Sequence, residues 1–256
     1  MKKMKIRILQ LNGWQGHFLS AIAKHIKTKK YDIVHLQEVA GGPMIGNIQD
    51  NYIFLKKRLK QYHSSIAYRF RGNKKDQSYM ANATFYKRKF FLTEEKVVWL
   101  KKSPRFDYRE QKWRNTPLNV LSLLLRLGTK KFYSVNTHLI WGSTPKEWPY
   151  KRTQNKKFVK YIKTLKHPTL LTGDFNITAD SATIKDLNKL ASNLTLRNKI
   201  SNTLNPRTHK AKHLFPKGWA VDYIFSSRHF KVEKFRVIKS PNLSDHYGLE
   251  ATLELT

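Results

Sequence analysis

Short apolar runs along the chain alternate with longer stretches in which apolar residues recur every three or four positions. The first pattern is typical of buried β-strands and the second of amphipathic helices. We expect strands near residues 5–11, 33–37, 83–86, 119–126, 131–137, 169–173, 221–225 and 249–255. We expect helices near residues 16–28, 45–61, 151–165 and 182–191. This interleaving predicts an α/β protein, and the lack of a linker, a repeat or a low-complexity stretch predicts one domain over residues 1–256.

The composition is that of a folded protein without thiol chemistry. Of the 256 residues, 40% are hydrophobic, which is enough apolar material for a packed core. Cysteine is absent, which excludes disulfide frameworks, thiolate zinc sites and cysteine nucleophiles. The chain has no run of about 18 apolar residues, which is the length that a membrane-spanning helix needs. Polar residues after the first lysines also interrupt the apolar core that a secretion signal needs, so we expect a cytoplasmic protein. Nothing in the sequence suggests a partner chain, so we expect a monomer.

The charge points to a polyanionic partner. Lys and Arg number 50 against 17 Asp and Glu, a formal net charge of +33 spread over the whole chain. Solubility alone asks for a net charge of only about 2–8. Such a field attracts nucleic acid first, with DNA the leading candidate, and an anionic membrane surface second. A general lysine bias of the proteome would make the charge uninformative.

Polar residues that could do chemistry stand where the predicted strands end or are interrupted. They are Asn12, Glu38, His138, Asp174, Asn176, Asp222, Asp245 and His246. A single such residue is usually a turn former, a helix cap or a satisfied core histidine. An acid inside an apolar strand, as at Asp222, is harder to dismiss because a buried carboxylate needs a partner or a metal. In so basic a chain, acids at several strand ends suggest a hard cation held by oxygen ligands.

Five motifs carry most of these residues, in a fixed order along the chain. They are LQEV at 36–39, NTHL at 136–139, GDFN at 173–176, VDYIF at 221–225 and SDHYG at 244–248. Together they resemble the endonuclease/exonuclease/phosphatase superfamily, which includes DNase I-like nucleases, exonuclease III-type abasic-site endonucleases, neutral sphingomyelinases and inositol polyphosphate 5-phosphatases. The resemblance runs from Asn12 to the C-terminus. It implies a four-layer α/β sandwich in which two packed mixed β-sheets are flanked by helices, with the site in a cleft between the sheet edges.

The resemblance implies phosphodiester hydrolysis with Mg²⁺, for which Mn²⁺ could substitute. Glu38 would be the principal metal ligand, with Asn12 and Asp245 close to the metal or its waters. Asp174 would orient and deprotonate the attacking water, and Asn176 would hold the phosphate and the water in place. These roles suit a pentacoordinate transition state, in which negative charge builds up on the phosphoryl oxygens and the attacking water must be aligned with the leaving group.

The resemblance also assigns the two histidines. His246 would donate to a phosphoryl oxygen, kept charged and in the right tautomer by Asp222. His138 would donate to the phosphate or the leaving oxygen, and near its ordinary pKa it could act as a general acid. DNase I-like enzymes support this histidine with a glutamate, whereas residues 67–71 offer arginines. Either Asp76 takes that role or His138 is less tightly oriented.

The substrate is less well defined than the chemistry. Exonuclease III-type enzymes carry a carboxylate two residues after the first Asn and a Tyr at the position of His138, and this chain departs from both patterns. We expect phosphate contacts from Arg69, Arg71, Arg114 and Arg152. The leading hypothesis is a DNase-like endonuclease of low sequence specificity. The alternatives are a phospholipid or sphingomyelin phosphodiesterase, or another phosphoesterase of the superfamily, and a nucleic-acid-binding module without catalysis.

Overall fold

Two six-stranded sheets form the centre of the protein in the computed structural model, which describes residues 4–43, 49–72, 77–103, 113–216 and 218–256. The first sheet has the order β11 (Phe230–Ile238), β12 (Gly248–Leu255), β1 (Lys5–Asn12), β2 (Ile33–Gly41), β4 (Tyr79–Lys87) and β3 (Tyr62–Arg71). The second has the order β5 (Phe91–Lys101), β6 (Leu118–Leu127), β7 (Lys130–His138), β8 (Thr169–Asp174), β10 (Asp222–Ser226) and β9 (Ser192–Asn193). In each sheet one central pair is parallel, β1 with β2 and β7 with β8, so both sheets are mixed.

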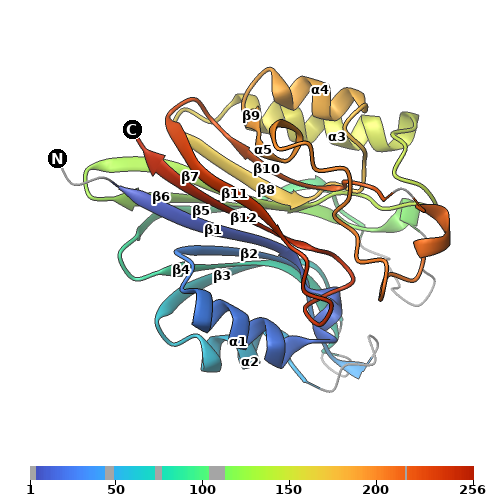
Figure 1. Cartoon of the computed structure of the whole chain (residues 1–256), viewed down its shortest axis with the longest axis horizontal. Coiled ribbons are helices and arrows are strands. Elements are labelled where there is room, and N and C mark those ends of the chain that lie inside the picture. The colour runs from blue at the N-terminus through green and yellow to red at the C-terminus, as the bar shows by residue number, and fades with distance from the viewer. Residues whose placement is uncertain (1–3, 44–48, 73–76, 104–112, 217) are drawn as a thin grey trace.

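Helices cover the outer face of each sheet (Figure 1). On one side lie α1 (Leu19–Lys29) and α2 (Asn51–Arg58), and on the other lie α3 (Pro149–Lys163), α4 (Ala182–Asn188) and the short α5 (Leu194–Arg197). Three apolar clusters fill the spaces between these layers. One cluster lies between the sheets and includes Ile8 and Leu123. The other two lie between a sheet and its helices, where Ile22 of α1 packs against the first sheet and Phe158 of α3 packs against the second. The predicted four-layer α/β sandwich is confirmed.

The strands that the sequence pattern did not predict are β3, β5, β9 and β11, which are the four sheet edges. Edge strands carry charged and polar residues because an exposed apolar edge would pair with other chains. In β5 the first six side chains are exposed, and β11 reads FKVEKFRVI with mostly half-exposed positions. Their apolar signal is therefore too weak to separate them from loops.

The helix boundaries also differ from the prediction. The first helix begins at Leu19 because a tight turn precedes it, in which Trp14, Gln15 and Gly16 have φ of +44°, +53° and +84°. The second is shorter than expected and begins after Asp50, whose carboxylate accepts a hydrogen bond from the Ile53 N–H. Its predicted first residues lie outside the described part of the chain.

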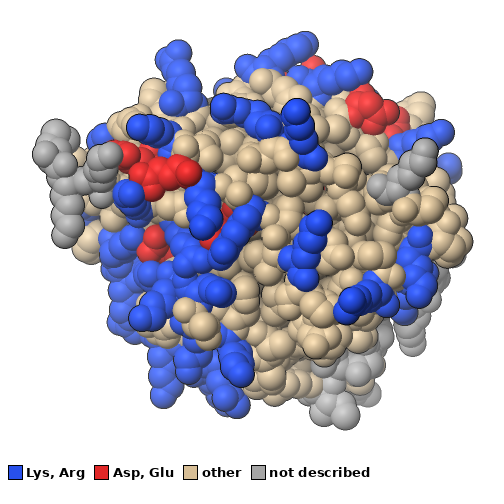
Figure 2. Space-filling view, in the orientation of Figure 1, with Lys and Arg blue, Asp and Glu red and all other residues tan. Residues whose placement is uncertain are grey.

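The surface is basic, as the composition requires. Lys and Arg side chains outnumber Asp and Glu on the face that Figure 2 shows. Over the described ranges, no helix has the length and apolar character to span a membrane.

Candidate active site

The predicted site residues meet at one edge of the sandwich, where the central parallel strands end. Asn12 is the last residue of β1, His138 of β7 and Asp174 of β8. Asp174 is the direct neighbour of His138 on one side and of Asp222 on the other. Neighbouring strands lie about 4.8 Å apart, so sheet register alone brings these three side chains together.

Two backbone features allow this arrangement. A Cβ on Gly173 would lie 2.0 Å from the carbonyl oxygen of Thr137, so only glycine lets β8 approach β7 this closely before Asp174. Glu38 has φ of +54° and lies at a break in the pairing of β2 with β4. Such strained positions in a strand are common where a side chain must be aimed at a site. Glu38 accordingly lines a cavity at the sheet edge.

The carboxylate of Asp174 is buried among hydrogen-bond donors. Its Oδ2 accepts from Asn12 Nδ2 at 3.1 Å, and its Oδ1 accepts from the backbone N–H of Asn176 at 2.9 Å. Burial, and next the charge of Asp222, raise the pKa of Asp174 to about 7. A carboxylate with a pKa near the working pH is suited to take a proton from water.

His246 and Asp222 form a second buried pair. His246 Nδ1 lies 2.9 Å from Asp222 Oδ2, which also accepts from Thr203 Oγ1 at 2.6 Å, while Asp222 Oδ1 accepts from Gln10 Nε2 at 3.0 Å. Burial alone would lower the pKa of His246, but the charges of Asp222 and Asp174 outweigh it and hold that pKa well above the ordinary value. His246 is therefore a cation that donates through Nδ1, and its Nε2, 3.8 Å from Asp174 Oδ2, is free to donate to a substrate oxygen.

Arg69, rather than an acid, orients His138. Arg69 Nη1 lies 2.8 Å from His138 Nδ1, and Arg69 Nε donates to the carbonyl of Pro117 at 3.2 Å. A guanidinium can only donate, so His138 Nδ1 accepts and Nε2 carries the proton, 3.5 Å from Asp174 Oδ2. Burial, and next the charge of Arg69, lower the pKa of His138 well below its ordinary value. The expectation of an ordinary pKa for His138 is therefore not met, and its Nε2–H is a neutral donor. Asp76 lies outside the described residues.

Glu38, Asn12 and Asp245 could hold a metal ion. Asn12 Nδ2 donates to Glu38 Oε1 at 3.2 Å, and Asp245 Oδ1 accepts from Ser244 Oγ at 3.2 Å. Glu38 and Asp245 line the same cavity, and burial raises the pKa of Asp245. Carboxylate oxygens converging on one space are the donor set that Mg²⁺ and similar hard cations prefer. The side chains present therefore fit a divalent cation.

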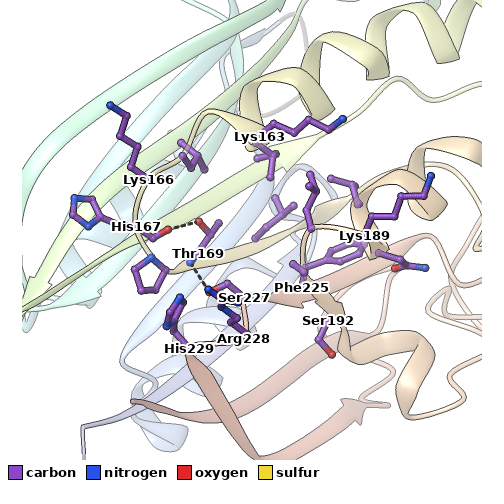
Figure 3. A pocket seen from close by; sticks show the side chains of 18 residues that line it. Lys163, Lys166, His167, Thr169, Lys189, Ser192, Phe225, Ser227, Arg228 and His229 are labelled. Carbon is purple, nitrogen blue, oxygen red and sulfur yellow. Dashed lines mark hydrogen bonds between the residues drawn. The ribbon is translucent and has the colours of Figure 1, made fainter.

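The cavity beside these carboxylates has a volume of about 270 Å³. Its wall is formed by Trp14, Gln15, Glu38, Arg69, Phe70, Met80, Thr116, His138, Trp141, Lys210 and Asp245. A wider cavity of about 620 Å³ lies at the other end of β8, where Figure 3 shows Lys163, Lys166, Lys189 and Arg228 around it. No carboxylate is among its described lining residues, so it offers no acid for a hard cation. The smaller cavity combines acids, a catalytic histidine candidate and access.

The predicted phosphate-binding arginines are scattered. Arg69 lines the cavity but is buried against His138. Arg71 and Arg114 are exposed, and Arg71 packs over the Tyr68 ring. Arg152 donates to Asp186 at 2.5 Å and joins α3 to α4, and it does not line this cavity, so its contact with phosphate stays a prediction.

Several positioning residues were not predicted. Gln10 stands two positions before Asn12, and a polar residue inside an apolar strand was the available signal. Lys151 is fully buried and donates through Nζ to the carbonyls of Asn176 (2.8 Å) and Thr144 (3.1 Å). Nothing in the sequence separates it from the many surface lysines. His209 lies with its ring centroid 5.7 Å from that of His246, and its loop carries no motif.

Comparison with known proteins now identifies the family. The family model described as "Endonuclease/Exonuclease/phosphatase family" matches residues 12–246. The chain belongs to this family. No curated protein sequence gives a significant match.

Solved structures of the family share the fold at low sequence identity. An endonuclease/exonuclease/phosphatase from Bacteroides vulgatus has a TM-score of 0.75 and 20% identity, covering 99% of this chain and 100% of its own. The mannosyl-6-phosphatase of Bacteroides thetaiotaomicron has a TM-score of 0.70 and 18% identity, covering 97% of this chain and 99% of its own. The human Nocturnin catalytic domain with bound sulfate has a TM-score of 0.70 and 18% identity, covering 99% of this chain and 98% of its own. The family identifies the chain as a phosphoesterase of the hydrolase class, and the range of its relatives leaves the substrate unassigned.

Proposed function

We propose that this family member is a Mg²⁺-dependent phosphodiesterase that cleaves nucleic acid, in the manner of a DNase-like endonuclease. The observation that carries the proposal is the position of Asp174 between charged His246 and neutral His138. The carboxylates of Glu38 and Asp245 lie beside this group. The net charge of +33 supports a polyanionic substrate over a small neutral one. DNA is the substrate class we favour.

Each side chain of the site has a part in the proposed reaction. Asp174 would accept a proton from the attacking water, since its raised pKa makes it a base near pH 7. Charged His246 and neutral His138 would donate through Nε2 to phosphoryl oxygens as negative charge builds on them. Asn176 would hold the phosphate. A Mg²⁺ ion at Glu38, Asn12 and Asp245 would stabilise the charge on the leaving oxygen.

Cleavage of circular DNA tests the proposal directly. Supercoiled plasmid and single-stranded circles are incubated with wild type and Mg²⁺, beside EDTA, Asp174→Asn and His246→Ala controls. Linear or nicked products that disappear in all three controls are the expected result. Intact DNA with well-folded wild type would overturn the nuclease proposal and direct the assay to sphingomyelin vesicles. Cleavage that survives Asp174→Asn would remove Asp174 from its role as base.

Salt dependence tests the polyanion part separately. Each phosphate contact releases bound counterions, so we expect kcat/KM on DNA to fall about 10³-fold or more between roughly 50 and 200 mM NaCl if six or more phosphates are bound. A rate that hardly changes over this range would argue against a substrate gripped through many phosphates.

A further inference from the structure

We propose that the cavity beside Glu38 and Asp245 binds one unpaired nucleobase of the substrate, held against Trp14 and Trp141. The inference rests on the proposed function and narrows it to DNA or RNA with an unpaired base next to the cleaved phosphate. It concerns the part of the cavity wall that takes no part in the chemistry.

The cavity wall combines charged and polar side chains with large apolar ones. Glu38, Asp245 and His138 belong to the first group, and Trp14, Phe70, Met80 and Trp141 belong to the second. Flat aromatic side chains next to a phosphate site are what a nucleobase needs, because every base has a face on which an aromatic ring can stack. Trp141 is 38% exposed even though it is one of the large apolar side chains of the chain, so its ring is accessible.

The backbone holds Trp14 at this wall at a conformational cost. Trp14 and Gln15 both have positive φ, which side chains other than glycine rarely adopt. The turn is fixed from outside, since Asn51 Nδ2 donates to the Gln15 carbonyl at 2.8 Å and a Cβ on Gly16 would lie 2.2 Å from the same amide. Strain that the surrounding structure maintains is typical of functional positions.

The turn is also linked to the catalytic residues. The Trp14 N–H donates to Asn12 Oδ1 at 3.0 Å, and Asn12 in turn donates to Glu38 and Asp174. One face of the Trp14 ring is covered by His17, at 4.1 Å between centroids and 10° between planes. Stacking on His17 fixes the ring as a rigid platform, so a base bound there would meet the scissile phosphate in one orientation.

The size of the cavity favours a single base. About 270 Å³ is close to the lower end of ligand pockets, which span about 300–1,000 Å³. That space is large enough for one planar base. A base of a duplex would have to leave its stack before it could enter.

The test compares two matched single-stranded oligonucleotides that differ only in one base. One has a normal nucleotide next to the cleaved bond and the other has an abasic analogue there, and kcat/KM is measured on both with Mg²⁺. The enzymes are wild type, Trp14→Ala, Trp14→Phe, Trp141→Ala and Trp99→Ala. Trp99 is the control because it is 39% exposed, as Trp141 is 38% exposed, but lies on the edge strand β5.

Stacking on an aromatic ring changes binding by about five- to 150-fold per base. We expect wild type and Trp99→Ala to prefer the base-containing substrate by at least fivefold. Trp14→Ala and Trp141→Ala lose this preference, and Trp14→Phe regains part of it. Trp141→Ala keeps the proposal testable if Trp14→Ala disturbs the turn.

Three results would overturn the inference, and a fourth would overturn the proposed function itself. Equal rates on both substrates with wild type, or an unchanged preference in both alanine variants, would exclude base binding at this wall. Hydrolysis of a hexose 6-phosphate that depends on Trp14 and Trp141 would make the cavity a sugar site instead. Absence of cleavage of every oligonucleotide would refute the nuclease proposal.

Discussion

Replacing His35 by Gln is expected to change how the stability of the protein depends on pH. His35 lies on β2, fully buried between the sheets, three residues before Glu38. Its Nδ1 lies 2.7 Å from Thr172 Oγ1, and its Nε2 lies 2.7 Å from Ser134 Oγ. Thr172 and Ser134 are on β8 and β7, the strands that end in the catalytic residues. This one ring therefore links the first sheet to both central strands of the second.

Burial lowers the pKa of His35 to about 3, against about 6.5 in an unfolded chain. The native state thus binds fewer protons than the unfolded state below pH 6.5. The contribution of His35 to stability is fully present above that pH and is lost as the pH falls toward 3. Between pH 8 and pH 4.5 the loss amounts to about 3 kcal/mol, or on the order of 100-fold in the unfolding equilibrium constant.

Urea unfolding at both pH values measures this effect, followed by tryptophan fluorescence and far-ultraviolet circular dichroism to verify that the transitions coincide. His35→Gln keeps a donor and an acceptor but cannot titrate. The stability advantage of wild type over His35→Gln should shrink by about 3 kcal/mol from pH 8 to pH 4.5. His63→Gln, at an exposed histidine of β3, controls for the loss of a histidine as such. An advantage that stays constant with pH would refute the assignment of a neutral buried ring.

Three further predictions concern the site. Asp222→Asn removes the carboxylate that keeps His246 charged, so kcat should fall about 100-fold or more. The affinity for Mg²⁺, measured by calorimetry, should stay within about threefold of wild type. An unchanged kcat would show that the Asp222–His246 pair takes no part in the reaction. Arg69→Gln removes a positive charge that lowers the pKa of His138, so a second protonation step on the acidic side of the kcat/KM profile, below that of Asp174, should move to higher pH. A second step that stays in place would exclude His138 as the group it reports. Mg²⁺ should raise the melting temperature of wild type but not of Glu38→Gln, because a ligand that binds only the folded protein stabilises it; equal shifts would place the ion elsewhere.

The central strands of both sheets could be predicted from the sequence. Buried strands have a strong apolar pattern, and the residues that interrupt or end it, such as Asp174 and Asp222, have few structural reasons to be there. The edge strands could not be predicted in the same way, since their side chains face solvent and resemble loops. The ends of the elements depended on local conformations, such as the turn at Trp14, that no periodicity reports.

Contacts between distant segments account for what sequence reasoning missed in the site. Arg69 and His138 are separated by 69 positions, so the sequence does not show that they are in contact. An arginine in a basic chain is more easily interpreted as a substrate ligand than as the group that sets the tautomer of a histidine. Lys151 is one basic residue among 50, and only packing shows that it is fully buried under the Asn176 loop. Both assignments needed the three-dimensional positions of side chains whose chemical type was already evident.

The acids of the site and the basic surface oppose each other electrostatically, and this opposition bears on how the enzyme would work. A phosphate drawn in by the surface charge would meet Glu38 and Asp245 at the cavity, with Asp174 and Asp222 buried nearby, and all four would repel it when ionised. The site contains its own compensation, because His246 is held charged by Asp222 and Arg69 adds a buried cation at His138. A divalent cation at Glu38 and Asp245 would complete it. Binding of the phosphate and of the metal should therefore be mutually favourable, whereas long-range attraction of the polyanion depends on the surface and is weakened first by salt.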